Sequence, residues 1–115
     1  NGFITKRNAR LCIPQFIMTD GPLGPNGRGH ATNYSAMINL AATFDVPLMA
    51  KVAENIGEEV RILGRNMLLG PCINIARVPQ GGRTFEGFGE DPYLVSRMTV
   101  AYVKGVQSKH VVTCT

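Results

Sequence analysis

Apolar residues recur at helical spacing in two segments of the chain. The first segment covers residues 45–64, where Asp45 is placed to cap the helix, Pro47 lies in the first turn and Gly64 follows as a terminating residue. Its apolar positions are Leu48, Val52, Ile56, Val60 and Leu63. The pattern predicts an amphipathic helix of about 18 residues.

The second helical segment begins after a long polar stretch. Asp91 is its expected N-cap, Pro92 its first residue, and the pattern ends near Gln107. Its expected buried positions are Leu94, Met98, Ala101, Tyr102 and Val106.

Three short, mostly apolar segments alternate with these helices: residues 12–19, 66–75 and 111–115. They are typical of parallel strands covered on both faces, and the Gly70-Pro71 pair predicts a local kink in the second. Residues 1–10 are polar, and we expect them to end a helix. The alternation of strands and helices predicts an α/β fold with parallel crossovers.

Length limits this fold. The chain has 115 residues, roughly half of an eight-stranded α/β barrel, so any barrel here is incomplete. It starts without Met and stops in an apolar run with no turn signal, from which we expect a piece of a longer protein. Hydrophobic residues make up 44% and charged residues 17%, which is typical of a packed globular protein and not of a disordered one.

Charge and hydropathy exclude two classes of partner. The net charge is +4, but the basic residues are scattered, whereas a surface that follows nucleic-acid phosphates needs clustered cations. The chain contains no apolar run of about 18 residues, so the sequence predicts no membrane-spanning segment. Neither feature settles the compartment or the oligomeric state.

The three cysteines are Cys12, Cys72 and Cys114. Their spacing fits neither a zinc site nor a dense disulfide framework. We therefore expect buried free thiols and no metal.

Polar and glycine residues concentrate where the first two strands end, in residues 21–30 and 76–90. Carboxyl ends of parallel strands lie on the same side of a sheet, so the two loops are candidates to face one pocket. Asp20 is the first polar residue after the first strand and would lie at the rim of a barrel. Initiation of a turn by its side chain is the alternative.

The second loop carries the other candidates. Arg83 follows two glycines, and its guanidinium can donate to two ligand oxygens, although an ordinary surface arginine fits the same pattern. Glu86, Glu90 and Asp91 form a cluster of carboxylates, the groups that sugar hydrolysis uses in pairs. Spacing alone selects no pair, and Asp91 is most simply a helix cap.

Five strings taken together resemble the N-terminal barrel domain of glycoside hydrolase family 3, especially its β-glucosidase branch. They begin at Phe16 (FIMTDGPLG), Asn39 (NLAATFD), Leu69 (LGPCINIAR), Gly82 (GRTFEGFGEDPYL) and Tyr102 (YVKGVQ). The resemblance extends over about residues 10–115. It implies that residues 1–115 are a fragment of a TIM-type (β/α)8 barrel, incomplete at both ends, with about three strands and two to three helices.

The resemblance also implies an activity. Such enzymes are retaining, exo-acting hydrolases that release terminal β-D-glucose from a small β-glucoside or an oligosaccharide, through a covalent intermediate and without a metal or other cofactor. A β-xylosidase or β-N-acetylglucosaminidase of the same family, and a relative that binds sugar without cleaving it, are the alternatives.

Roles for individual residues follow from the same resemblance. The residue at Asp20 would hold hydroxyls of the terminal sugar, Arg83 would add hydrogen bonds in the same subsite, and Glu86 would orient basic residues of the site. Many relatives have an arginine where this chain has Asn26, and the nearest arginine here is Arg28, a further candidate for sugar contact.

The resemblance places no catalytic residue in this chain. A Lys-His-Phe motif would begin directly after Thr115, the nucleophilic aspartate would lie much further on, and the acid/base would come from a later region. The pair Lys109-His110 precedes the third strand and does not correspond to that motif. We expect the 115 residues alone to be inactive.

Overall fold

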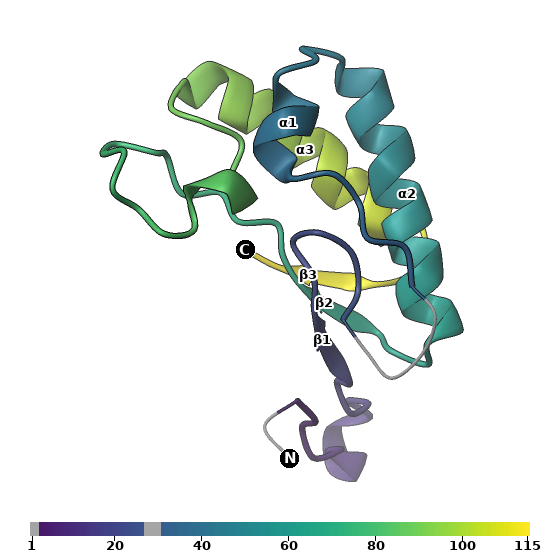
Figure 1. Cartoon of the computed structure of the whole chain (residues 1–115). Coiled ribbons are helices and arrows are strands. Elements are labelled where there is room, and N and C mark those ends of the chain that lie inside the picture. The colour runs from purple at the N-terminus through teal and green to yellow at the C-terminus, as the bar shows by residue number, and fades with distance from the viewer. Residues whose placement is uncertain (1–2, 27–30) are drawn as a thin grey trace.

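The computed structural model describes residues 3–26 and 31–115, which form a three-stranded parallel sheet with helices packed on it (Figure 1). The strands are β1 (Met18–Asp20), β2 (Met67–Leu69) and β3 (Val112–Cys114), hydrogen-bonded in the order β1-β2-β3. Both pairs are parallel, so the predicted topology is confirmed. The middle residues Thr19, Leu68 and Thr113 are in register with one another.

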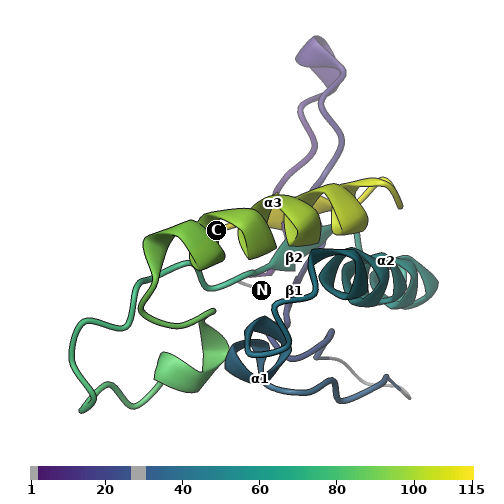
Figure 2. The ribbon, with the colours of Figure 1, turned by 90° about the horizontal axis from the view of Figure 1, so that it is seen from above.

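The strands are shorter than predicted. Residues 3–17 form an antiparallel hairpin, with bridges between Ile4 and Ile17 and between Asn8 and Ile13. Its tip is the 3-10 helix η1 (Ala9–Leu11), capped by the Asn8 side chain. The prediction that residues 1–10 end a helix is therefore wrong, and the hairpin projects from the rest of the molecule (Figures 1 and 2).

Helix α2 (Val46–Ile62) begins and ends as predicted. The Asp45 carboxylate accepts a hydrogen bond of 2.9 Å from the Leu48 amide, and Gly64 adopts a left-handed φ of 71° after the helix. The buried face is turned slightly from the predicted one and consists of Met49, Ala53, Ile56, Gly57 and Val60. Ala53 and Gly57 on this face are small, which lets another helix approach closely there.

That neighbour is helix α3 (Pro92–Gln107), which lies beside α2 (Figure 2). Asp91 caps it as predicted, by accepting a 2.9 Å hydrogen bond from the Leu94 amide. A Cβ on Gly105 would lie 2.7 Å from both the Ala50 carbonyl oxygen and the Ala53 Cβ. The core between the helices and the sheet includes Tyr102, Phe88, Leu68 and Val111.

One short helix was not predicted: α1 (Met37–Ala41) packs against α3 and against the 3-10 helix η2 (Thr84–Glu86). Ala36 precedes α1 without a side-chain cap, so the sequence carries no start signal there.

The cysteines differ from the prediction. All three are free, as expected, but Cys12 and Cys114 are exposed and Cys72 is only half-buried. Cys12 lies in the turn at the tip of the projecting hairpin, and Cys114 lies on β3, which has a neighbour on one side only among the described residues. Position in the fold, and not side-chain hydropathy, sets their exposure.

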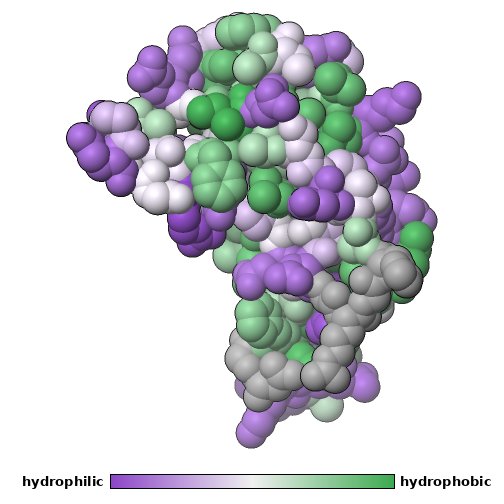
Figure 3. Space-filling model, viewed as in Figure 1, coloured by the Kyte–Doolittle hydropathy of each residue, from purple (hydrophilic) through white to green (hydrophobic). Residues whose placement is uncertain are grey.

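The surface combines apolar and hydrophilic residues (Figure 3). Phe44, Ile62 and Tyr93 are each about three-quarters exposed. Within residues 3–26 and 31–115, no helix is long and apolar enough to cross a membrane.

Candidate functional site

The carboxyl end of β1 carries Asp20 at the rim of the sheet. The chain turns tightly after it, since a Cβ on Gly21 would collide with the Gly24 carbonyl. The loop then folds back: the Asn26 amide donates to the Asp20 carbonyl oxygen at 2.8 Å, and the Thr19 hydroxyl donates to the Asn26 carbonyl oxygen at 2.6 Å. Thr19 is buried, whereas Asp20 is exposed.

The side chain of Asp20 does not initiate this turn. The backbone carbonyl of Asp20 accepts the loop hydrogen bonds, and its carboxylate has no hydrogen-bond partner among the described residues. The alternative of an Asp that caps a turn through its side chain therefore does not apply within that part of the chain. Within residues 3–26 and 31–115, the carboxylate is thus exposed and unpaired.

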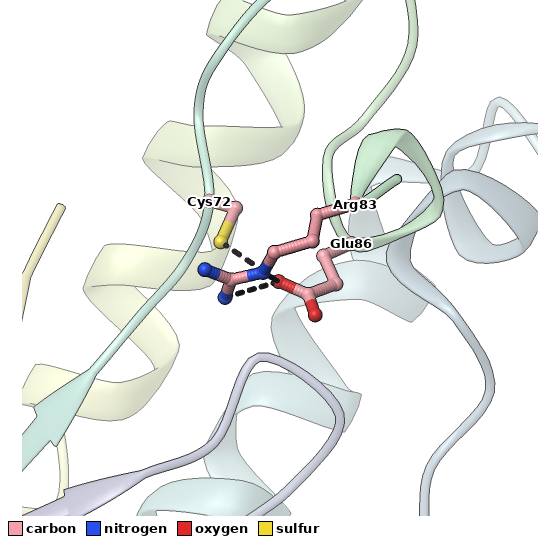
Figure 4. Close-up of polar contacts among 3 residues, drawn as sticks. All are labelled: Cys72, Arg83 and Glu86. Carbon is pink, nitrogen blue, oxygen red and sulfur yellow. Dashed lines mark hydrogen bonds and ion pairs between the residues drawn. The ribbon is translucent and has the colours of Figure 1, made fainter. Parts of the chain in front are cut away.

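Arg83 is held by Glu86 in the loop that follows β2. Arg83 directly precedes the 3-10 helix η2 and Glu86 ends it, and Glu86 Oε2 accepts from Arg83 Nε at 2.9 Å and from Nη2 at 2.6 Å (Figure 4). The Arg83 side chain is 75% exposed and that of Glu86 only 13%, so the carboxylate is the fixed partner. The Nη1 donors of Arg83 have no partner among the described residues.

Cys72 completes this cluster from the segment just after β2. Its thiol donates to the same oxygen, Glu86 Oε2, at a Sγ–O distance of 3.5 Å (Figure 4). The hydrogen bond from Arg83 lowers the pKa of Glu86, and the same contact raises the pKa of Arg83. Burial, followed by the Glu86 carboxylate, raises the pKa of Cys72. At neutral pH the cluster is an ion pair with a neutral thiol beside it.

The two loops meet at one cavity, as the parallel strand order predicts. A cavity of about 510 Å³ is lined by Asp20, Arg83, Glu86 and Cys72, together with Cys114 from the end of β3. Asp20 is close enough to add to the raised pKa of Arg83. A neighbouring cavity of about 400 Å³ is lined by Asp20, Glu86 and the loop after β1. The arrangement offers a free carboxylate and free guanidinium donors to one ligand, a combination suited to hydroxyl groups.

Other residues singled out from the sequence lie elsewhere. Glu90 is exposed, Asp91 is occupied as the cap of α3, and His110 is exposed at the end of the turn after α3. Arg28 lies outside the described residues. Within the part of the chain that the structure describes, no three potential ligand side chains come together as a metal site.

Sequence reasoning missed two contributors. Cys72 was expected to be a buried free thiol, and no feature of the sequence singled out Glu59. Glu59 accepts hydrogen bonds from Thr32 and Tyr34 in the loop before α1. No local signal marks either residue, because their partners are 14 to 27 positions away.

Comparison with known proteins gives consistent results. Residues 3–115 match the family model described as the glycosyl hydrolase family 3 N terminal domain. The chain is 43% identical to a β-glucosidase of Bacteroides ovatus over 91% of its length, and 40% identical to thermostable β-glucosidase B of Acetivibrio thermocellus over 96%. It spans 16% of the length of each of these relatives.

Solved structures agree. β-Glucosidase 3B of Thermotoga neapolitana, in complex with α-D-glucose, superposes with a TM-score of 0.89 at 38% identity, and the match covers 96% of this chain and 17% of that one. A β-D-glucoside glucohydrolase of Trichoderma reesei gives a TM-score of 0.85 at 35% identity, with 96% and 16% covered. The three parallel strands and their helices thus correspond to part of a TIM-barrel domain. The chain belongs to glycosyl hydrolase family 3, within the N-terminal domain of that family.

Proposed function

We propose that the protein containing this chain is a retaining exo-β-glucosidase, and that Asp20 and Arg83 hold the terminal glucose. The observation that carries the proposal is that these two side chains line one cavity at the carboxyl ends of the strands. Relatives at about 40% identity are named β-glucosidases, and the Thermotoga neapolitana structure contains glucose. Both points support a small sugar as the ligand.

The chemistry of the two side chains suits a pyranose. A carboxylate accepts hydrogen bonds from two neighbouring hydroxyls, and a guanidinium donates a fork of N–H groups to ring substituents. Such charge-assisted bonds are about twice as strong as neutral ones, so they can fix the ring before bond cleavage. Glu86 contributes indirectly, because it limits the rotation of Arg83.

We assign binding, and not bond cleavage, to these residues. Retaining hydrolysis needs a nucleophilic carboxylate and an acid/base about 5–5.5 Å apart. Of the two described carboxylates at the cavity, Glu86 is neutralised by Arg83, which leaves Asp20 without an acidic partner. We infer that both catalytic carboxylates come from outside residues 1–115, and that this segment is part of the family's barrel domain. The mechanism requires no metal or other cofactor.

The test is Asp20→Ala in the full-length protein. Loss of two charge-assisted hydrogen bonds, each of about 1.5–3 kcal/mol, would lower kcat/KM for an aryl β-glucoside by about 100-fold or more. Stability should change little, since the carboxylate is exposed. Glu54→Ala, an exposed acidic position on α2, is the control and should retain wild-type kinetics.

Three outcomes would redirect the assignment. Normal kinetics of the Asp20 variant would remove this residue from the sugar site. Faster turnover of an aryl β-xyloside or β-N-acetylglucosaminide by the wild type would change the substrate. Glucose binding without hydrolysis of any of the three would indicate a non-catalytic relative.

A further inference from the structure

Glu59 on α2 holds the loop segment that precedes α1. Its Oε2 accepts from the Thr32 amide at 3.0 Å, and its Oε1 accepts from the Thr32 hydroxyl at 2.6 Å and from the Tyr34 hydroxyl at 3.0 Å. Both carboxylate oxygens are thus engaged by residues 25 to 27 positions earlier in the chain.

The contacts of Glu59 differ from those of the adjacent glutamate on α2, Glu58. Glu58 is exposed and lies 3.9 Å from Lys109, a surface ion pair of little energetic weight. Glu59 has no cationic partner among the described residues and is half-buried against the loop. Partial burial, followed by the contact with Glu59, raises the pKa of Tyr34 to about 12. The Tyr34 hydroxyl therefore remains a donor at any pH at which the protein would be assayed.

The segment that Glu59 holds supports the wall of the cavity that adjoins the proposed sugar cavity and shares Asp20 and Glu86 with it. The Tyr34 amide donates to the Leu23 carbonyl oxygen at 2.9 Å. Gly24, with a left-handed φ of 111°, packs against Tyr34 so closely that a Cβ would lie 2.9 Å from a ring carbon. Leu23, Gly24 and Thr32 line the cavity of about 400 Å³ that also contains Asp20 and Glu86.

We propose that Glu59 is a positioning residue of the sugar site: by holding Thr32 and Tyr34 it fixes the loop wall beside Asp20. This inference rests on the proposed function. Glu59 would influence sugar affinity without touching the sugar, because it acts through the loop that lines the cavity. A helix residue outside the cavity would thereby control the shape of the cavity.

The experiment compares variants in the full-length protein. Glu59→Ala removes all three hydrogen bonds and should raise KM for an aryl β-glucoside about tenfold, with kcat within about twofold. Glu59→Gln keeps an oxygen acceptor for both hydroxyls but turns an NH2 donor toward the Thr32 amide, so it should restore part of the affinity that Glu59→Ala loses. Glu58→Ala is the matched control and should leave both constants unchanged.

A second measurement separates positioning from stability. Amide hydrogen exchange of residues 21–26 and 31–34 should accelerate in Glu59→Ala and in Tyr34→Phe, and not in Glu58→Ala. In a double-mutant cycle, Glu59→Ala and Tyr34→Phe should be non-additive in KM, because they remove the same contact. Tyr34→Phe and Glu59→Gln keep the test available if Glu59→Ala does not fold.

Two results would overturn the inference. A fall in kcat with unchanged KM would mean that Glu59 only maintains the folded fraction. Faster exchange of the loop with unchanged KM would mean that the loop does not shape the sugar site. Failure of the wild type to hydrolyse any β-glucoside would instead refute the proposed function, and the exchange data would still decide whether Glu59 holds the loop.

Discussion

Arg83 is positioned by a contact that uses only part of its donor set. Glu86 Oε2 accepts from Nε and Nη2 of Arg83, and the remaining N–H groups have no partner within residues 3–26 and 31–115 at the cavity that Arg83 shares with Asp20. A guanidinium is planar, so fixing one edge of it also fixes the direction of the opposite edge. Cys72 donates to the same oxygen and so restricts the Glu86 carboxylate that orients the guanidinium.

The first prediction at this scale concerns Arg83→Lys. An ammonium group is a point charge and cannot bond Glu86 and a sugar hydroxyl in a fork, so kcat/KM for an aryl β-glucoside should fall at least about tenfold. Steady-state kinetics of the full-length variant test this, with Arg97→Lys on the exposed side of α3 as the matched control. Unchanged KM and kcat would make Arg83 an ordinary surface residue.

Sequence reasoning singled out some of the residues at the candidate site and not others, for a physical reason. Asp20 is recognisable because it is the first polar residue after an apolar strand, and Arg83 because glycines precede it. Glu59 looks like its neighbours Glu54 and Glu58, because helical spacing places all three on the polar side of α2. Its role depends on Thr32, whose position relative to α2 is set by the fold.

At the scale of elements, the helices were predictable and the strand lengths were not. Asp45 and Asp91 act as caps through bonds to residues three positions on, so all the information is local. Strands of three residues carry little local signal, and their ends depend on which neighbour is available to accept the backbone hydrogen bonds. Apolar residues such as Ile73 and Ile75 therefore lie outside β2 and are exposed.

A prediction at this scale concerns the contact between α2 and α3. Gly105→Ala adds a methyl group 2.7 Å from Ala50 and Ala53. This overpacking should lower the free energy of unfolding by about 1–3 kcal/mol, which is more than the higher helix propensity of alanine adds to it. Urea denaturation of the full-length variant measures this loss of stability as a shift of the first unfolding transition. Gly82→Ala is the control: apart from the neighbouring residues in the chain, no atom of the described residues lies within 4 Å of the added Cβ, so stability should change by less than about 0.5 kcal/mol. A stabilised Gly105 variant would show that the helices can separate at little cost.

At the scale of the whole molecule, the described residues leave much apolar surface exposed. Phe44, Ile62 and Tyr93 are largely solvent-accessible, and apolar side chains reach the surface at many places (Figure 3). Asp20 and Arg83, which line the cavity, are likewise exposed. Both features agree with a segment that corresponds to about a sixth of its relatives.

The last prediction is that the isolated 115-residue chain does not hydrolyse an aryl β-glucoside above background. The sugar contacts that we propose for Asp20 and Arg83 could not replace two correctly spaced carboxylates. A colorimetric assay of the purified chain tests this, with the full-length protein at equal concentration as the positive control. Turnover that disappears in Asp20→Ala would contradict the assignment of Asp20 to binding alone.

The sequence by itself determined the α/β class, the parallel strand order, both long helices with their caps, and the family. The helices, caps and strand pattern depend on the spacing of residues that are close in sequence. The family depends on contiguous sequence motifs. Tertiary structure alone decided the hairpin of residues 3–17, the exposure of the cysteines, the Cys72–Glu86–Arg83 cluster and the hold of Glu59 on the loop. These features join residues distant in sequence, and such contacts arise only when the strands and helices have packed.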